Sequence, residues 1–95
     1  MKKYEITFIV KPDMEEADIT KTADELKKLL KSSKAKIESE KAEGQKELAY
    51  EIKKYTTGYY FLFVVEANSE TIAEFDRVAK INENLLRHLI VKVED

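Results

Sequence analysis

The sequence predicts an α+β fold in which two helices pack on one face of a four-stranded antiparallel sheet. Apolar residues alternate with polar ones in several short segments and recur with a helical period in two longer ones. These segments follow one another in the order β-α-β-β-α-β. With 95 residues and no cysteine, the chain is long enough for one hydrophobic core without disulfides. We therefore expect residues 1–95 to form a single domain.

The apolar run after Gly58 is the predicted central strand. Seven aromatic or aliphatic residues follow one another from Tyr59 to Val65, which is typical of a strand covered on both faces. A buried helix would need a longer run, and Thr56-Thr57-Gly58 is typical of a turn.

The segments before this run are one strand, one helix and a second, weaker strand. Residues 4–10 alternate and end before Pro12, because proline cannot extend a sheet ladder. Residues 15–31 form the first helix, with one apolar face made by Ile19, Ala23, Leu26 and Leu30. Residues 35–41 have the charged composition of an edge strand. After a bend at Gly44, residues 48–52 either resume that strand beyond a bulge or form a separate hairpin arm.

The last two segments complete the predicted sheet. Residues 70–80 form the second helix, with Ser69 as its expected cap and an inner stripe of Ile72, Phe75, Val78 and Ala79. Residues 86–93 form the last strand. This order is that of the ferredoxin-like fold, in which the first and third strands are central and the fourth pairs with the first.

Two helices can cover only one face of this sheet, so the other face is expected to be apolar and open. If Phe8, Phe61 and Phe63 face the helices, the opposite face carries Ile9, Tyr60, Leu62, Val64, Leu89 and Val91. Monomers rarely expose such a patch. We expect it to bind a partner protein or a second copy, chiefly through Ile9, Tyr60, Leu62, Val64 and Leu89. The alternative is a packed sheet with ordinary surface tyrosine and leucine.

The charge balance limits which RNA-binding arrangements are possible. Seventeen basic and nineteen acidic residues give a net charge of -2, whereas a free-standing nucleic-acid binder is usually basic. Pairing of the first and last strands would place Lys2, Lys3 and Tyr4 beside Lys92, with Arg87 further along. Cations beside an aromatic ring can neutralise phosphates and stack on a base. RNA contact and an ordinary solvated edge both remain open for this cluster.

Catalysis, metal binding and membrane insertion are not expected. The single histidine, His88, has no cysteine or second histidine with which to form a metal site, and a packed or surface role is expected for it. The turn hydroxyls lack a His–acid pair, and two glycines are too few for a phosphate loop. No segment is apolar enough for a signal peptide or a membrane span. We expect a cytoplasmic protein without cofactor or small-molecule substrate.

Several short motifs occur in a specific order along the chain. They are Lys3-Tyr4-Glu5-Ile6, Pro12, Gly44, Leu48-Ala49-Tyr50-Glu51-Ile52, Gly58-Tyr59, Glu74-Phe75-Asp76-Arg77, Lys80-Ile81, Arg87-His88 and Val91-Lys92. With these motifs the chain resembles, over essentially its full length, the ribosomal protein S6 family of the bacterial small ribosomal subunit. The segment Ala42-Glu43-Gly44-Gln45-Lys46 departs from the family, in which many members have an aromatic residue before the glycine and two basic residues after it.

The resemblance implies a structural, non-catalytic role in translation, on the cytoplasmic ribosome. It implies binding to the central domain of small-subunit ribosomal RNA together with ribosomal protein S18. The RNA contacts that it implies are Lys2, Lys3, Tyr4, Arg87 and Lys92. The competing hypothesis is a ferredoxin-like ligand-sensing or self-associating module that does not bind RNA.

Overall fold

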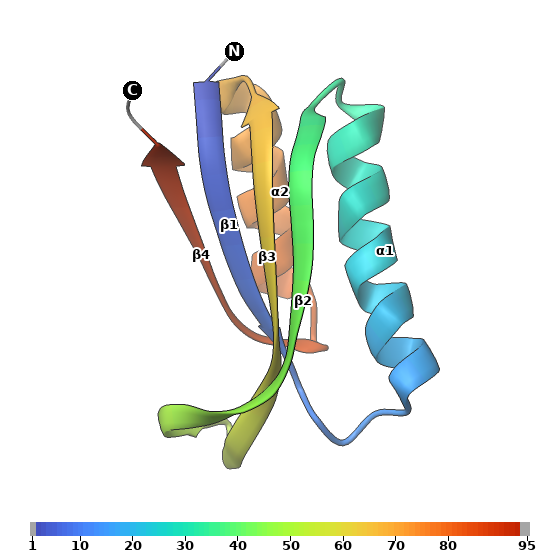
Figure 1. The fold of residues 1–95 in the computed structure, drawn as a ribbon, viewed down its shortest axis with the longest axis vertical. Coiled ribbons are helices and arrows are strands. Elements are labelled where there is room, and N and C mark those ends of the chain that lie inside the picture. Colours follow the sequence, from blue (N-terminus) through green and yellow to red (C-terminus); the bar gives the residue numbers. More distant parts are fainter. Residues whose placement is uncertain (1, 94–95) are drawn as a thin grey trace.

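The computed structural model describes residues 2–93 and has the predicted order of elements (Figure 1). Four strands form one antiparallel sheet in the order β2-β3-β1-β4, so β1 and β3 are central as predicted. Both helices lie on the same side of the sheet (Figure 1). The elements are β1 (Lys2–Val10), α1 (Glu16–Ser32), β2 (Lys36–Ile52), β3 (Tyr55–Ala67), α2 (Ser69–Ile81) and β4 (Leu85–Val93).

The hydrophobic core lies between the sheet and the helices. In the pairing of β1 with β3, Ile6 lies opposite Phe63 and Phe8 opposite Phe61. The Phe8 ring stacks on Phe61 with 5.1 Å between centroids and meets Phe63 edge-on at 5.2 Å. The prediction that these phenylalanines face the helices is therefore confirmed. The fully buried side chains are Ile6, Phe8, Val10, Leu26, Leu30, Phe63, Val65 and Phe75.

The helices bury residues of their predicted apolar faces, but the N-cap of α2 lies one residue earlier than expected. Asn68, not Ser69, is the N-cap, and its side-chain oxygen accepts a hydrogen bond from the Thr71 backbone amide at 2.8 Å. Asn68 has extended backbone angles, whereas Ser69 is already the first helical residue. The buried Thr71 hydroxyl also donates to the Ser33 carbonyl at 3.2 Å, which ties the start of α2 to the end of α1.

The β2–β3 hairpin settles one open question and corrects one prediction. Residues 48–52 continue β2 beyond a bulge, and β2 is one strand of 17 residues with three irregularities in its pairing. The predicted turn at Thr56–Gly58 is wrong, because those residues lie within β3. The chain reverses instead at Lys53 and Lys54, whose φ angles of 50° and 72° are positive, as in a type I′ hairpin turn.

The far end of this hairpin bends over the helix-free face of the sheet toward β4 (Figure 1). Gly58 lies in β3, on the second arm of this hairpin. An added Cβ at Gly58 would be only 2.3 Å from Ile9 Cγ2 of β1. Gly44, with φ +86°, occupies one of the irregular positions of β2. The bend covers Ile9, which is only 7% exposed although it faces away from the helices.

Candidate nucleic-acid interface

The start of β1 and the end of β4 bring four of the five predicted RNA-contact residues together. Tyr4 lies opposite Lys92 and Lys3 opposite Val93 in an antiparallel pairing, with Lys2 next in the chain. The predicted pairing of the first and last strands is thus confirmed. The lysines gather here because antiparallel pairing brings the start of β1 and the end of β4 to the same end of the sheet (Figure 1).

The side chains at this end differ in how much charge they can offer. Lys3 Nζ lies 3.2 Å from Glu38 Oε2, so its charge is partly offset. Lys2 and Lys92 are exposed, and no carboxylate of residues 2–93 lies within ion-pair distance of either. Tyr4 is partly buried and packs against the core. Lys2 and Lys92 are therefore the cations here that are best placed to meet a phosphate.

Arg87 lies apart from the lysines, near the opposite end of β4. It is opposite Ile9, five residues along β1 from Tyr4, which is roughly 16 Å of strand. Its guanidinium donates a hydrogen bond to the Tyr50 hydroxyl, and its central carbon lies 5.9 Å from the centroid of that ring. The predicted RNA contacts are therefore divided between two ends of the sheet.

The hairpin is held by contacts to two other parts of the fold and by one contact between its own strands. The Tyr55 hydroxyl donates to Asp13 Oδ2 at 2.6 Å, and this bond raises the pKa of the tyrosine. Lys53 Nζ lies 3.5 Å from the Leu85 carbonyl at the start of β4. On the sheet itself, Lys46 Nζ lies 5.6 Å from the centroid of Tyr60. The first two contacts fix the hairpin against the first loop and β4, and the third joins its two strands.

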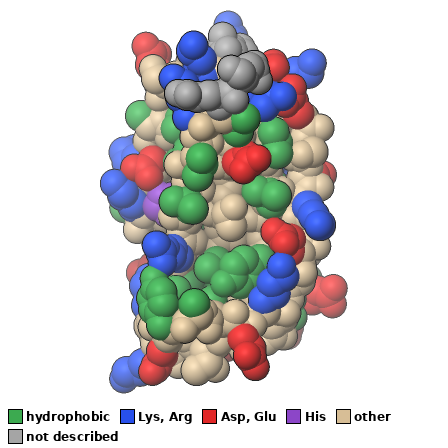
Figure 2. All heavy atoms as spheres, turned by 60° about the vertical axis from the view of Figure 1, so that its left-hand side comes forward, with side chains coloured by type: hydrophobic (Ala, Val, Ile, Leu, Met, Phe, Trp, Pro, Cys, Tyr) green, Lys and Arg blue, Asp and Glu red, His purple; other side chains and the backbone are tan. Residues whose placement is uncertain are grey.

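Beyond the bend, the helix-free face carries apolar side chains on β3 and β4, with polar side chains of β1 between them. Figure 2 shows hydrophobic side chains gathered along this side of the molecule, with charged ones interspersed. Leu89 is 54% and Val91 45% exposed on β4, and Leu62 and Val64 on β3 are half-buried. Thr7 and Glu5 of β1 lie between these two pairs. Ile9 was expected on a partner surface, but the hairpin already covers it.

His88 belongs to the helix-facing side of β4 and has a packing role. Its Nε2 lies 2.7 Å from Asp76 Oδ1 on α2, and Lys80 Nζ lies 3.0 Å from the other oxygen of that carboxylate. The hydrogen bond from His88, and after it the one from Lys80, lowers the pKa of Asp76. In residues 2–93 no three histidine or acidic side chains are grouped so that they could hold a metal ion.

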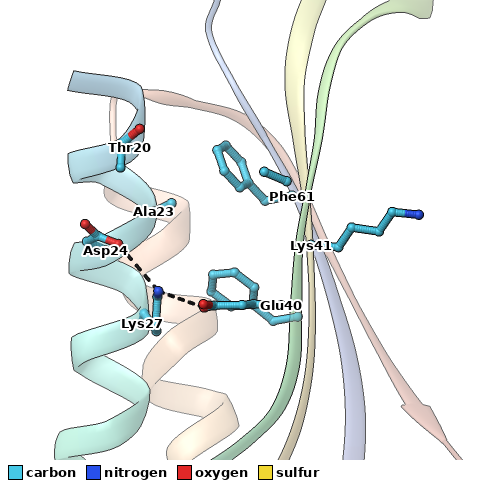
Figure 3. Close-up of a pocket in the computed structure, with 9 residues that line it drawn as sticks. Thr20, Ala23, Asp24, Lys27, Glu40, Lys41 and Phe61 are labelled. Carbon is cyan, nitrogen blue, oxygen red and sulfur yellow. Dashed lines mark ion pairs between the residues drawn. The ribbon is translucent and has the colours of Figure 1, made fainter. Parts of the chain in front are cut away.

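A hollow of about 290 Å³ lies between α1 and β2 (Figure 3). Ala23, Phe61 and Phe63 are among the apolar residues that line it. Lys27 at its rim lies 2.7 Å from Glu40 and 3.6 Å from Asp24, and its pKa is raised chiefly by the bond to Glu40. Lys41 points away from the helix (Figure 3). The hollow therefore offers no unpaired cation to a phosphate.

Comparison with known proteins identifies the family. Residues 3–92 match the family model described as ribosomal protein S6. The chain belongs to the ribosomal protein S6 family. It is 43% identical to small ribosomal subunit protein bS6 of Halalkalibacterium halodurans over 95 residues, which cover 100% of both chains. Its structure is similar to the crystal structure of 30S ribosomal protein S6 from Thermotoga maritima, with a TM-score of 0.93 and 24% identity over 97% of this chain and 87% of the other.

Membership of the S6 family confirms the predicted resemblance, and the match to the Thermotoga structure confirms the predicted fold. The protein is a small ribosomal subunit protein, and its place is the cytoplasmic ribosome. Separately, neither helix in residues 2–93 is long and apolar enough to cross a membrane.

Tyr50 was not among the site residues predicted from the sequence of this S6-family chain. It lies in the motif Leu48-Ala49-Tyr50-Glu51-Ile52, which supports the family resemblance but carried no predicted role of its own. Its contact with Arg87 joins residues 37 positions apart and depends on the bend of the hairpin. The indication available in the sequence was an aromatic residue within the alternating segment 48–52.

Proposed function

We propose that this S6-family protein binds the central domain of small-subunit ribosomal RNA jointly with ribosomal protein S18, as a structural component. The observation that supports this most is the 43% identity along the whole length of a small ribosomal subunit protein. The proposal assigns the protein no reaction, metal or cofactor.

The RNA interface in this proposal consists of Lys2, Lys3, Tyr4, Lys92 and, at the other end of β4, Arg87. Lys2 and Lys92 contact phosphates, because they are exposed and close to each other across the paired strands. Tyr4 packs against the core and steadies the strand that presents the lysines. Arg87 belongs to the interface at the bent end of the hairpin, where its guanidinium donates a hydrogen bond to the Tyr50 hydroxyl.

The partner protein explains two features that would be unusual in a protein acting alone. A net charge of -2 does not favour binding to a polyanion, so a basic partner would supply part of the attraction. The exposed apolar surface would in turn be covered by that partner. We assign S18 to the helix-free face at Tyr60, Leu62, Val64 and Leu89, with Ile9 beneath the hairpin as support.

A filter-binding titration on a central-domain ribosomal RNA fragment, with and without S18, tests the proposal. We expect tight binding only when S18 is present. In that complex, the double variant Lys2→Gln and Lys92→Gln should bind more weakly and show a salt slope smaller by about two, since each lost phosphate contact lowers the slope by about one.

The matched control is Lys21→Gln with Lys28→Gln, two exposed lysines of α1. This variant should keep the salt slope of the original protein. Equal binding without S18 would contradict the joint mechanism, and a folded protein that binds no RNA with S18 would contradict the proposal as a whole.

Self-association through the same apolar face is the second candidate. The exposure of Leu89 and Val91, which lie two residues apart on β4, favours it. Light scattering at micromolar concentration would detect a dimer. A stable dimer that binds neither RNA nor S18 would replace the ribosomal proposal with that of a self-associating module.

A further inference from the structure

Tyr50 is an exposed aromatic ring at a fixed place on the bent end of the β2–β3 hairpin. It is 58% exposed, although large apolar or aromatic side chains gain most when they are covered. Its neighbours Leu48 and Ile52 are half-buried, which keeps this part of β2 against the fold. The ring is thus held at the surface and is not packed into the core.

Arg87 holds the ring at its hydroxyl end. The guanidinium donates to the Tyr50 hydroxyl, and its 5.9 Å separation from the ring centroid is close to the outer limit of about 6 Å for a cation–π contact. A guanidinium stacked on the ring would lie nearer to the centroid. The charge therefore sits toward the hydroxyl edge of the ring, and 58% of the residue stays exposed.

The contacts described above also anchor the turn that follows the ring. Tyr55 is bonded to Asp13, and Lys53 reaches the Leu85 carbonyl, so the turn beyond Tyr50 is tied to two other segments. A platform that is already ordered loses little conformational entropy when a ligand binds. This geometry suits recognition better than a mobile loop would.

The charges around the ring favour a ligand that carries phosphates. Lys53 and Lys54 form the turn three and four residues beyond Tyr50, and both are exposed. No carboxylate of the described residues 2–93 lies within ion-pair distance of Lys53, Lys54 or Arg87. An exposed ring next to unpaired cations is the arrangement with which proteins hold an unpaired nucleotide, by stacking its base and neutralising its phosphate.

We propose that Tyr50 is a stacking platform for one unpaired base of RNA. Arg87 is the positioning residue that orients the ring, and Lys54 of the turn meets the adjacent phosphate. This inference rests on the proposed RNA-binding function and adds the chemical nature of one contact: a single-stranded nucleotide at the hairpin, roughly 16 Å of strand away from the lysines at the other end of β4.

The test uses the full chain with S18 and the central-domain ribosomal RNA fragment, and compares Tyr50→Leu with Tyr50→Phe. Tyr50→Leu should weaken binding by roughly 5- to 150-fold, the range for loss of one base–aromatic stack. Tyr50→Phe keeps the ring and loses only the hydrogen bond to Arg87, so its loss should be smaller. Neither variant should change the salt slope, because no phosphate contact is removed.

Arg87→Gln, alone and combined with Tyr50→Leu, separates positioning from direct phosphate contact. If Arg87 acts through Tyr50, its substitution weakens binding in the original protein but adds little once the ring is gone. Additive losses with a salt slope smaller by about one for Arg87→Gln would overturn the positioning role.

Two further outcomes distinguish this inference from the function on which it rests. Tight binding by the original protein with no loss in Tyr50→Leu would overturn the stacking platform and leave the proposed function standing. Absence of RNA binding by the original protein would overturn both. Thermal unfolding of Tyr50→Leu near the original temperature would show that any loss arises at the interface.

Discussion

At Gly58 the backbone of β3 passes so close to β1 that no side chain fits. An ideal Cβ would lie 2.3 Å from Ile9 Cγ2 and 3.5 Å from Leu86 Cδ1. Isoleucine is branched at Cβ and cannot easily rotate out of the way. The absent side chain therefore lets Ile9 and Leu86 fill the space under the bent hairpin, where both are buried.

Gly58→Ala should destabilise the protein by about 1–3 kcal/mol, the usual cost of overpacking a core. Urea unfolding measures this change. Because the collision is with one side chain, the double variant with Ile9→Ala should lose less stability than the sum of the two single losses.

Gly44→Ala is the matched control for that pair. Nothing lies within 4 Å of a Cβ at Gly44, and the cost there comes from its φ of +86°. Ile9→Ala should not relieve it. Additive losses for Gly58→Ala and Ile9→Ala would contradict the close contact.

The pairing of His88 with Asp76 joins two elements, β4 and α2, on the covered side of the sheet. The bond is 2.7 Å long, and Lys80 supports the same carboxylate from one turn further along α2. Both contacts favour the ionised form of Asp76, so its pKa in the folded protein lies below the ordinary value.

Asp76 should therefore stabilise the fold at pH values above its unfolded pKa of about 4, and this contribution should disappear as the pH falls through the lower folded pKa. Nuclear magnetic resonance titration of the Asp76 carboxyl group measures that pKa. His88→Leu should raise it toward the ordinary value, and Lys80→Met should raise it less, because the His88 bond is the larger cause. A larger rise in Lys80→Met would show that the lysine dominates.

The elements that the sequence predicted well are those in which the spacing of apolar residues follows from which side chains are buried. The stripe of α1 and the alternation of β1 follow directly from packing on one side, and Phe8 with Phe63 fell on the expected face. The hairpin had no such pattern. Lys53 and Lys54 adopt positive φ angles although neither is glycine or asparagine, so the residue types did not indicate the turn. Most residues of the long strand β2 are exposed, so its apolar residues show no clear period.

The same reasoning explains which parts of the candidate site could be predicted. The lysines near the chain start meet Lys92 because strand pairing alone sets their neighbourhood. The contact of Arg87 with Tyr50 depends on irregular pairing at three places in β2, which shifts the direction of the strand. Of the three irregularities, the sequence indicated the one at Gly44, through the glycine itself and not through a period.

At the scale of the whole molecule, the helices cover one face of the sheet only, and the open face carries exposed apolar side chains. Leu89 and Val91 are 54% and 45% exposed on that face of β4, whereas Ile81 is 68% exposed on α2. A protein with a net charge of -2 and an uncovered apolar surface is suited to act next to another protein.

The double variant Leu89→Thr and Val91→Thr should test this arrangement. Threonine suits a strand, and exposed substitutions usually change stability by no more than about 0.5 kcal/mol each, so the fold should persist. Calorimetric titration with S18 should show weaker binding, because the apolar area that the partner covers is reduced. Ile81→Thr removes a comparable apolar side chain from a helix and should leave that binding unchanged. Equal affinity for S18 in the original protein and in the β4 double variant would show that the partner binds elsewhere, and a loss in Ile81→Thr would point to the helical side.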